Sequence, residues 1–225
     1  MARYKMDSPL QLVRVWDLPV RLFHWIVVLL LAAAYITWRL NWMDWHVWIG
    51  ETVLTAVLFR ILWGCVGSDT ARFSQFVASP RAALRHLAHS LRREPDCQVG
   101  HNAAGSWMVL VLLALLLAET LTGLYVNNDV ADEGPFTEIA PAAVSNAITA
   151  LHTYLWDALL TAAAVHVLAI ALYALAKGHN LLAPMISGRK LLPADVIAPR
   201  TAGIVRAAVL LACSALVVAA LAYFL

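Results

Sequence analysis

The chain has 225 residues, of which 62% are hydrophobic and only 13% are charged. Soluble domains are about 45–50% apolar and about 25% charged, so this composition excludes an ordinary soluble protein and indicates an integral membrane protein. The net charge of +2 is small, and we expect no nucleic-acid partner. One helical bundle accounts for the whole length, so we expect a single membrane domain, residues 1–225.

Long apolar segments dominate the chain. A hydrocarbon core of about 30 Å needs roughly 20 apolar residues of helix, and an isolated strand cannot satisfy its backbone in lipid. The first segment is long and rich in Trp, which indicates a retained anchor helix and not a cleaved signal. The sequence therefore predicts five transmembrane helices, in chain order at about 20–38, 47–66, 105–126, 149–176 and 203–224.

The segment 80–93, PRAALRHLAHSLRR, lies between the second and third predicted spans. It begins with Pro and interleaves Leu with Arg, which is typical of an amphipathic helix lying on a membrane surface. We expect it to anchor the loop, with His86 and His89 solvated. None of the three cysteines belongs to a C-x-x-C-H motif, so covalent attachment of a c-type haem is not indicated.

The connections between the spans differ sharply in charge. Lys and Arg mark cytoplasmic loops, and they gather before the first span and in the second and fourth connections. The loop 127–146 lies on the opposite side and carries four acids without a Lys or Arg. Arg39 is the only Lys or Arg that we assign to this side. The sequence therefore predicts a cytoplasmic N-terminus, an outer C-terminus and an outer aromatic belt of Trp38, Trp42, Trp45 and Trp48.

This topology assigns a depth to the histidines within the spans. His152 and His166 are 14 positions apart on the fourth span, so they share one helix face and are separated by about 21 Å. His46 lies at the outer level of His152, and His24 lies at the inner level of His166. Haem b needs two axial imidazoles from facing helices around an apolar slot, so these pairs predict an outer and an inner bis-histidine haem.

Charged and small residues lie beside the predicted ligands. Arg60 follows His46 by 14 positions and faces the same way at the inner level, where haem propionates are a suitable partner for a costly membrane cation. Arg21, three residues before His24, could serve the same haem. Gly50 and Gly64 lie one turn beyond His46 and Arg60, where glycine would let a flat ring approach the backbone.

The polar residues of the spans could also serve roles that need no haem. A single membrane histidine more often donates a hydrogen bond between helices or relays a proton than binds a metal. A zinc site would need its ligands at one depth. A haem-free, proton-coupled transporter could combine the histidines with Glu51, Glu119 and Asp157. Glu51 and Asp157 lie near the outer interface, where solvation explains them. Glu119 lies deeper and has no assigned role.

The motif GHNAAG places His101 at the inner start of the third span. Capping or loop hydrogen bonding explains both His101 and His179. The more specific hypothesis is that His101 lines a pocket for a quinone headgroup beside the inner haem, because a quinone needs a protonatable hydrogen-bonding group at the membrane edge.

Several stretches resemble a known family. VWDLPVRLFHW (15–25) and HVWIGETVLTAVLFRILWGCVGS (46–68) resemble the first two helices of bacterial di-haem b-type cytochromes, which include the cytochrome b-561 type and the b-type subunit of nickel–iron hydrogenases. GHNAAGSWMVL (100–110) and ISGRK (186–190) are similar to its third-helix opening and tail. The resemblance implies a four-helix core in the bacterial inner membrane, two haems b on His24, His46, His152 and His166, and electron exchange with quinone. The fifth helix lies beyond it.

These observations favour an electron-transfer cytochrome that connects quinone with a periplasmic redox partner, such as a c-type cytochrome or a hydrogenase. The four acids of the outer loop suit the docking of a basic protein, although a solvated loop explains them too. A superoxide oxidase that reduces quinone is an alternative within the same fold. An anionic substrate prefers a positive outer mouth, however, and here only Arg39 could supply one.

Overall fold

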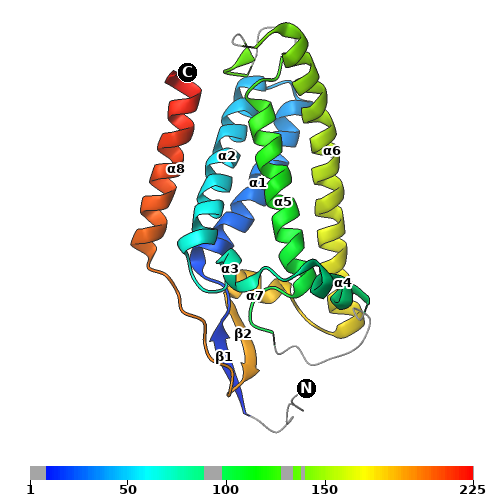
Figure 1. Ribbon diagram of the computed structural model, residues 1–225, viewed down its shortest axis with the longest axis vertical. Helices are drawn as coiled ribbons and strands as arrows, with labels where there is room; N and C mark the ends of the chain where they lie inside the picture. Colours follow the sequence, from blue (N-terminus) through cyan, green and yellow to red (C-terminus); the bar gives the residue numbers. More distant parts are fainter. Residues whose placement is uncertain (1–8, 89–97, 128–133, 138–139, 225) are drawn as a thin grey trace.

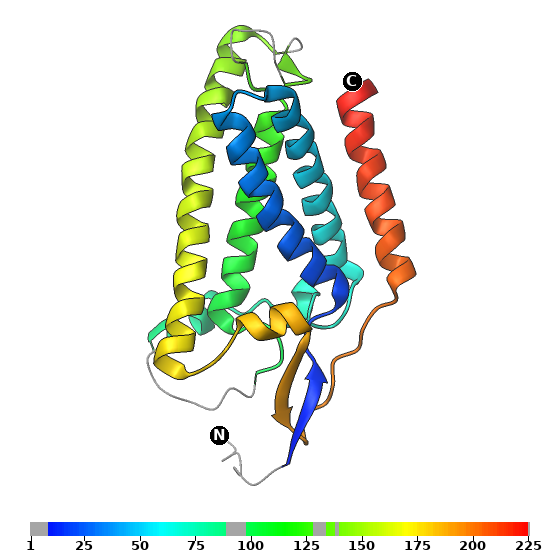
Figure 2. The same ribbon diagram turned by 180° about the vertical axis from the view of Figure 1, so that it is seen from behind.

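The computed structural model describes residues 9–88, 98–127, 134–137 and 140–224. Its long helices are α1 (Leu18–Arg39), α2 (Met43–Val66), α5 (Ala103–Gly123), α6 (Ala142–Leu172) and α8 (Ile204–Phe224). Helices α1, α2, α5 and α6 run side by side as a four-helix bundle, and α8 lies beside α2 on the side away from α6 (Figures 1 and 2). All five are long and apolar enough to cross a membrane, so the predicted all-α membrane fold is confirmed.

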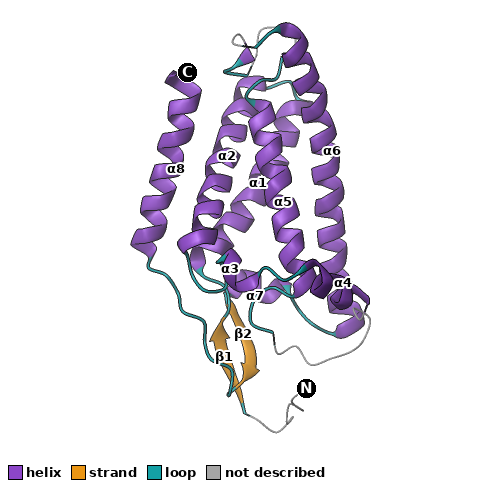
Figure 3. Cartoon of the chain, viewed as in Figure 1, coloured by secondary structure: helices purple, strands orange, loops and turns teal. Residues whose placement is uncertain are grey.

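Short elements close one end of the bundle, which we call the inner end (Figure 3). They are β1 (Leu10–Arg14), α3 (Phe73–Phe76), α4 (Pro80–Ala88), α7 (Leu182–Ser187) and β2 (Arg189–Pro193). The α1–α2 turn and the segment after α5 form the opposite, outer end. The charge pattern predicts that the inner end is cytoplasmic. Of the predicted amphipathic segment, residues 80–88 form α4, and 89–93 lie outside the described residues.

The sequence analysis did not predict the antiparallel pair β1 and β2, in which Leu10 pairs with Pro193 and Arg14 with Arg189. Each strand has only five residues, and neither shows a long alternating pattern. The ribbon is held at one edge by Gln11, whose side-chain amide donates to the carbonyl of Val196 at 2.7 Å. It connects the start of α1 to the segment that leads to α8.

Local capping explains where the core helices begin. The carboxylate of Asp17 accepts from the Val20 backbone N–H at 2.8 Å and caps α1, and its second oxygen accepts from the Trp63 indole of α2 at 2.9 Å. The Asn102 side chain caps α5 by accepting from the Gly105 N–H at 2.7 Å. Such caps satisfy backbone donors that the helix itself leaves open, and Asp17 also fixes α1 against α2.

Several helix boundaries differ from the predictions by a few residues; α2, for example, begins at Met43 and not at 47. Helix α6 begins at Ala142, directly after Pro141, and not at 149, because hydropathy detects only the apolar part of a helix that extends past the hydrocarbon. Helix α5 ends at Gly123 and not at 126. Beyond it, the Leu124 and Val126 carbonyls accept from Phe136 and Gly134, each at 2.9 Å, so the returning loop takes the place of further helical bonds.

Helix α8 is attached to the α2 end of the bundle through polar contacts at the inner end. Asp69 accepts from the Arg200 backbone N–H at 2.9 Å, and Ser68 accepts from the Ala202 N–H at the same distance. The Arg206 guanidinium donates to the Val66 carbonyl. The Arg200 N–H, and then the nearby Arg72, hold the pKa of Asp69 below its usual range, so this carboxylate is charged at neutral pH.

Candidate functional site

The four histidines that were predicted as haem ligands lie at two levels of the bundle. His152 and His166 share the inward face of α6, with Leu159 seven residues from each and only 1% exposed. His24 on α1 lies opposite His166, and His46 on α2 is close enough to His152 for the imidazoles to interact electrostatically. Between the two levels lies an apolar layer of Val27, Val53, Val57, Leu116 and Leu159.

The inner pair consists of His24 and His166, whose ring centroids lie 6.3 Å apart with an angle of 57° between the ring planes. A metal bound to one nitrogen of each ring at about 2 Å places the ring centres roughly 6 Å apart. Nδ1 of His24 is buried and has no hydrogen-bond partner, which is unusual for a polar atom inside a protein. The spacing of this pair fits a bis-histidine haem iron.

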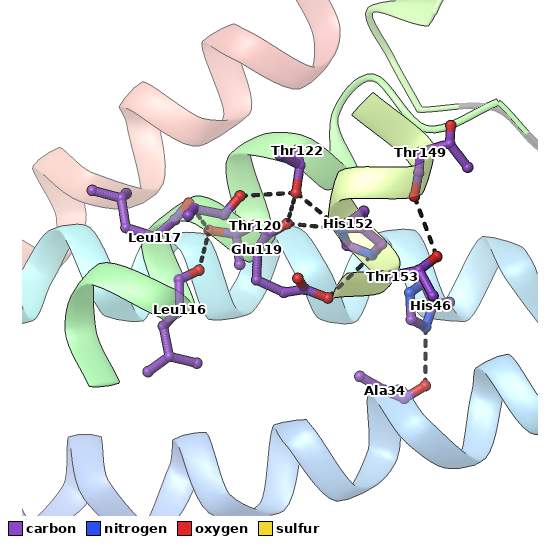
Figure 4. A network of polar contacts seen from close by, with 11 residues as sticks. Ala34, His46, Leu116, Leu117, Glu119, Thr120, Thr122, Thr149, His152 and Thr153 are labelled. Atoms are coloured by element: carbon purple, nitrogen blue, oxygen red, sulfur yellow. Dashed lines mark hydrogen bonds and ion pairs between the residues drawn. The ribbon is translucent and has the colours of Figure 1, made fainter. Parts of the chain in front are cut away.

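The outer pair, His46 and His152, has a different hydrogen-bonding environment. Nδ1 of His46 lies 2.9 Å from the carbonyl oxygen of Ala34 on α1. Nδ1 of His152 lies 3.0 Å from the Glu119 carbonyl oxygen on α5 (Figure 4). A carbonyl can only accept, so both Nδ1 atoms carry the proton and both Nε2 atoms are unprotonated. This is the tautomer that a metal-ligating histidine with a carbonyl partner adopts.

Polar side chains of α5 surround His152. The hydroxyl oxygen of Thr122 lies 3.1 Å from Nδ1, and Oε1 of Glu119 lies 3.3 Å from Nε2 (Figure 4). The other carboxyl oxygen of Glu119 is buried without a partner. The sequence analysis left Glu119 without a role and missed Thr122. The sequence feature that could have indicated both residues is the polar turn AETLTG (118–123), which ends an otherwise apolar helix.

Glycines beside the predicted haems differ in their surroundings. At Gly50, one turn inward from His46, nothing lies within 4 Å of the position that a Cβ would occupy, so this part of α2 faces open space beside the outer pair. At Gly64 a Cβ would collide with the Phe73 ring. The flat ring that approaches Gly64 in this structure is therefore a side chain of the protein itself.

The two arginines predicted beside the inner haem have protein partners here. Arg60 is only 3% exposed, and its guanidinium donates to the Ala71 carbonyl at 3.3 Å and lies over the Phe73 ring. Arg21 donates to the backbone carbonyls of Met185 and Ile186. Both cations lie at the inner end, as predicted, and their contact with propionates stays a prediction.

His101 lies at the inner end between two aromatic rings. Its ring centroid is 4.6 Å from that of Trp16 and 4.5 Å from that of Phe76, and its Nδ1 is buried without a hydrogen-bond partner. Burial, followed by the positive charge of Arg60, lowers the pKa of His101 to about 3. The imidazole is therefore neutral at physiological pH and can donate or accept a hydrogen bond.

The expectation that His86 is solvated is wrong. Its Nε2 lies 2.6 Å from the Tyr173 hydroxyl, which also accepts from the Asn102 side chain at 3.2 Å. Tyr173 begins a π-helical turn (Tyr173–Lys177) that continues α6. The α4 helix thus contributes a side chain to a polar cluster at the inner ends of α5 and α6. His89 lies outside the described residues.

Five membrane-crossing helices, with histidines facing one another inside the bundle, define the class of b-type membrane cytochromes. The family model for prokaryotic cytochrome b561 matches residues 15–188, and the chain belongs to this family. Searches of curated proteins and of solved structures gave no match. The chain is therefore a b-type haem protein of electron transfer and a multi-pass protein of the bacterial inner membrane, as predicted. This membership speaks against the haem-free transporter.

Proposed function

We propose that the chain is a di-haem cytochrome that transfers electrons between a periplasmic redox partner and membrane quinone. His46 and His152 hold the outer haem, and His24 and His166 hold the inner one. The observation that carries this proposal is the 6.3 Å separation of the His24 and His166 rings, together with two outer imidazoles whose Nδ1–H groups donate to carbonyls, which leaves Nε2 unprotonated in each ring.

Bound haem supplies reversible one-electron chemistry at each level. The chain's own residues set its position and surroundings. The carbonyls of Ala34 and Glu119 orient the outer imidazoles, and Gly50 leaves space beside them. The side chains of the apolar layer around Leu159 offer no hydrogen-bonding group between the two levels.

The site for quinone in this proposal lies beside His101. The neutral imidazole can form a hydrogen bond with a quinone carbonyl, and the inner position of His101 suits a headgroup that enters from the membrane edge. The partner in the proposal is a basic periplasmic redox protein, such as a c-type cytochrome, that binds the acidic outer loop. Its four acids, Asp129, Asp132, Glu133 and Glu138, lie outside the described residues, so this part of the proposal depends on the sequence.

The test of the proposal is the haem content of the purified protein. Oxidised and dithionite-reduced absorption spectra, combined with haem extraction and protein quantification, should give about two non-covalent haems b per chain. One haem per chain would mean that one of the two pairs is assigned wrongly. A preparation without haem, from cells that supply it in excess, would refute the proposal.

The quinone site is tested by replacing His101 with Leu. The change removes the hydrogen-bonding nitrogen but keeps an apolar side chain between Trp16 and Phe76, so we expect a KM for a soluble quinone analogue that is raised about 10-fold, as for the loss of about 1.4 kcal/mol of binding, with both haems retained. His179→Leu, which alters another histidine of the inner end, is the control. An unchanged KM in His101→Leu would contradict the assignment.

A further inference from the structure

We infer that Arg14 and Arg189 together bind the phosphate group of an anionic phospholipid at the inner face of the membrane. The two arginines belong to the paired strands β1 and β2, which extend from the inner end of the bundle (Figure 1). This lipid site is separate from the haem and quinone sites of the proposed function, so it stands or falls independently of them.

The two arginines lie directly opposite each other at the end of the ribbon nearest the bundle. Antiparallel strands alternate hydrogen-bonded and non-hydrogen-bonded pairs. The Val15 N–H donates to the Gly188 carbonyl at 2.9 Å, so the neighbouring pair, Arg14 and Arg189, is of the non-hydrogen-bonded kind, whose Cα atoms lie only about 4.5 Å apart. Like charges directly opposite each other destabilise a strand pair, and an anion bound between them would offset that cost.

The arginine pair lies on the ribbon face that is turned away from the core. Side chains alternate between the two faces of a strand, so Arg14 shares its face with Leu12, and Arg189 shares its face with Leu191. All four are exposed, whereas Val13 on the other face is buried. Both guanidiniums are therefore accessible to a ligand.

Neither guanidinium has a hydrogen-bond or ion-pair partner among the residues that the structure describes. Asp17, three residues after Arg14, has its two carboxylate oxygens occupied by the Val20 N–H and the Trp63 indole. Asp195 follows the far end of β2. The pair thus presents two positive charges side by side, and no described acid forms an ion pair with either.

The position of the pair along the membrane normal matches that of lipid phosphates. Helix α1 begins at Leu18, four residues after Arg14, and such a stretch spans at most about 13 Å. Arg189 follows α7 by two residues, and α7 lies across the inner end of the bundle (Figure 2). Leu18 and Ile186 of these two helices are about half-exposed, as suits contact with acyl chains. The long arginine side chains can reach the headgroup layer beside them.

A phosphate diester is the anion that this arrangement suits. A guanidinium forms parallel N–H···O bonds to phosphate oxygens, and two guanidiniums on opposite strands can hold two oxygens of one phosphate. The charge pattern predicts that this end is cytoplasmic, and the cytoplasmic leaflet carries anionic lipids. Arg21, by contrast, already donates to the Met185 and Ile186 carbonyls. A lipid held by the pair would bridge β1 and β2 and stabilise the ribbon.

The experiment measures binding of phosphatidylglycerol to the delipidated, detergent-purified holoprotein by native mass spectrometry, with zwitterionic phosphatidylcholine for comparison. We expect the wild type to prefer phosphatidylglycerol. Arg14→Gln/Arg189→Gln should bind phosphatidylglycerol about 10-fold more weakly and should leave phosphatidylcholine binding unchanged. The matched control is Arg200→Gln/Arg206→Gln, which removes two exposed charges from the inner end at the start of α8 and should keep the wild-type affinity.

Two results would overturn the inference. One is a wild type without preference for phosphatidylglycerol. The other is an equal loss of affinity in both double variants, which would show only general attraction to a positive surface. Both ribbon positions are exposed, so the variant should fold, as checked by circular dichroism. If it does not, Arg189→Gln alone removes one of the two guanidiniums and should still weaken phosphatidylglycerol binding.

A second measurement distinguishes a lipid from a soluble phosphate, which offers the same oxygens without acyl chains. A ligand that binds only the folded state raises the unfolding temperature. Phosphatidylglycerol should therefore raise it in the wild type and not in Arg14→Gln/Arg189→Gln. Millimolar inorganic phosphate should neither raise it nor displace the lipid. If inorganic phosphate did both, the pair would be a site for soluble phosphate, and the assignment to lipid would be refuted.

Discussion

Replacing His46 with Ala is expected to reduce the haem content from about two to about one per chain, because an outer haem held by His152 alone loses half of its axial ligation. The inner pair lies at the other end of the bundle, beyond the apolar layer around Leu159, and should keep its haem. The measurement is extracted haem per chain, together with the amplitude of the reduced-minus-oxidised α-band, which should fall to roughly half.

The matched control for this prediction is His179→Ala, which removes an imidazole from the segment after α6 and should leave both haems in place. His24→Ala should give the complementary result, with only the outer haem retained. If His46→Ala kept two haems, its assignment as a ligand would be refuted. If it lost both while the protein remained folded, the independence of the two levels would be wrong.

Replacing Asp17 with Ala should lower the free energy of unfolding by about 2–4 kcal/mol. The cap of α1 contributes about 1 kcal/mol, and an unsatisfied buried Trp63 N–H costs about 1–3 kcal/mol. Asp17 is only 5% exposed and Trp63 is fully buried, so water cannot replace the carboxylate. The measurement is the unfolding of the detergent-solubilised holoprotein, with loss of helical circular dichroism as the signal.

Two further variants separate the contributions at Asp17. Asp17→Asn keeps a side-chain oxygen that can accept one of the two hydrogen bonds, so it should recover part of the loss. Asp69→Ala also removes a carboxylate that binds a backbone N–H, but at a partly exposed position where water can take its place, so it should be much less harmful. A loss below about 0.5 kcal/mol in Asp17→Ala, as at an ordinary surface position, would contradict the role given to Asp17.

Several features of the candidate site could be predicted because they depend on local patterns. Apolar length defines a span, Lys and Arg define its orientation, and the helical repeat places His152 and His166 on one face. The residues around those histidines could not be predicted in the same way. The carbonyl of Ala34 gives no sequence signal, since every residue has one, and the polar turn that contains Glu119 and Thr122 does not by itself indicate which histidine it will meet.

The small inner sheet and the surroundings of Gly64 illustrate the same limit. Five-residue strands 175 or more positions apart pair because the fold brings the segment before α1 beside the segment after α7. Gly64 was expected to admit a flat ring, and the structure places the Phe73 ring there. Sequence spacing predicts that a glycine leaves room, whereas the packing of the following loop determines what occupies it.

The sequence by itself determined the family, the five spans, the predicted orientation and the two depths of the histidines, because hydropathy, charge and helical period act over short distances along the chain. Only the tertiary structure decided how those histidines are surrounded. The rotation and packing of α1 and α5 bring carbonyl acceptors to the outer imidazoles and leave Nδ1 of His24 without one. No local pattern in the sequence contains this difference.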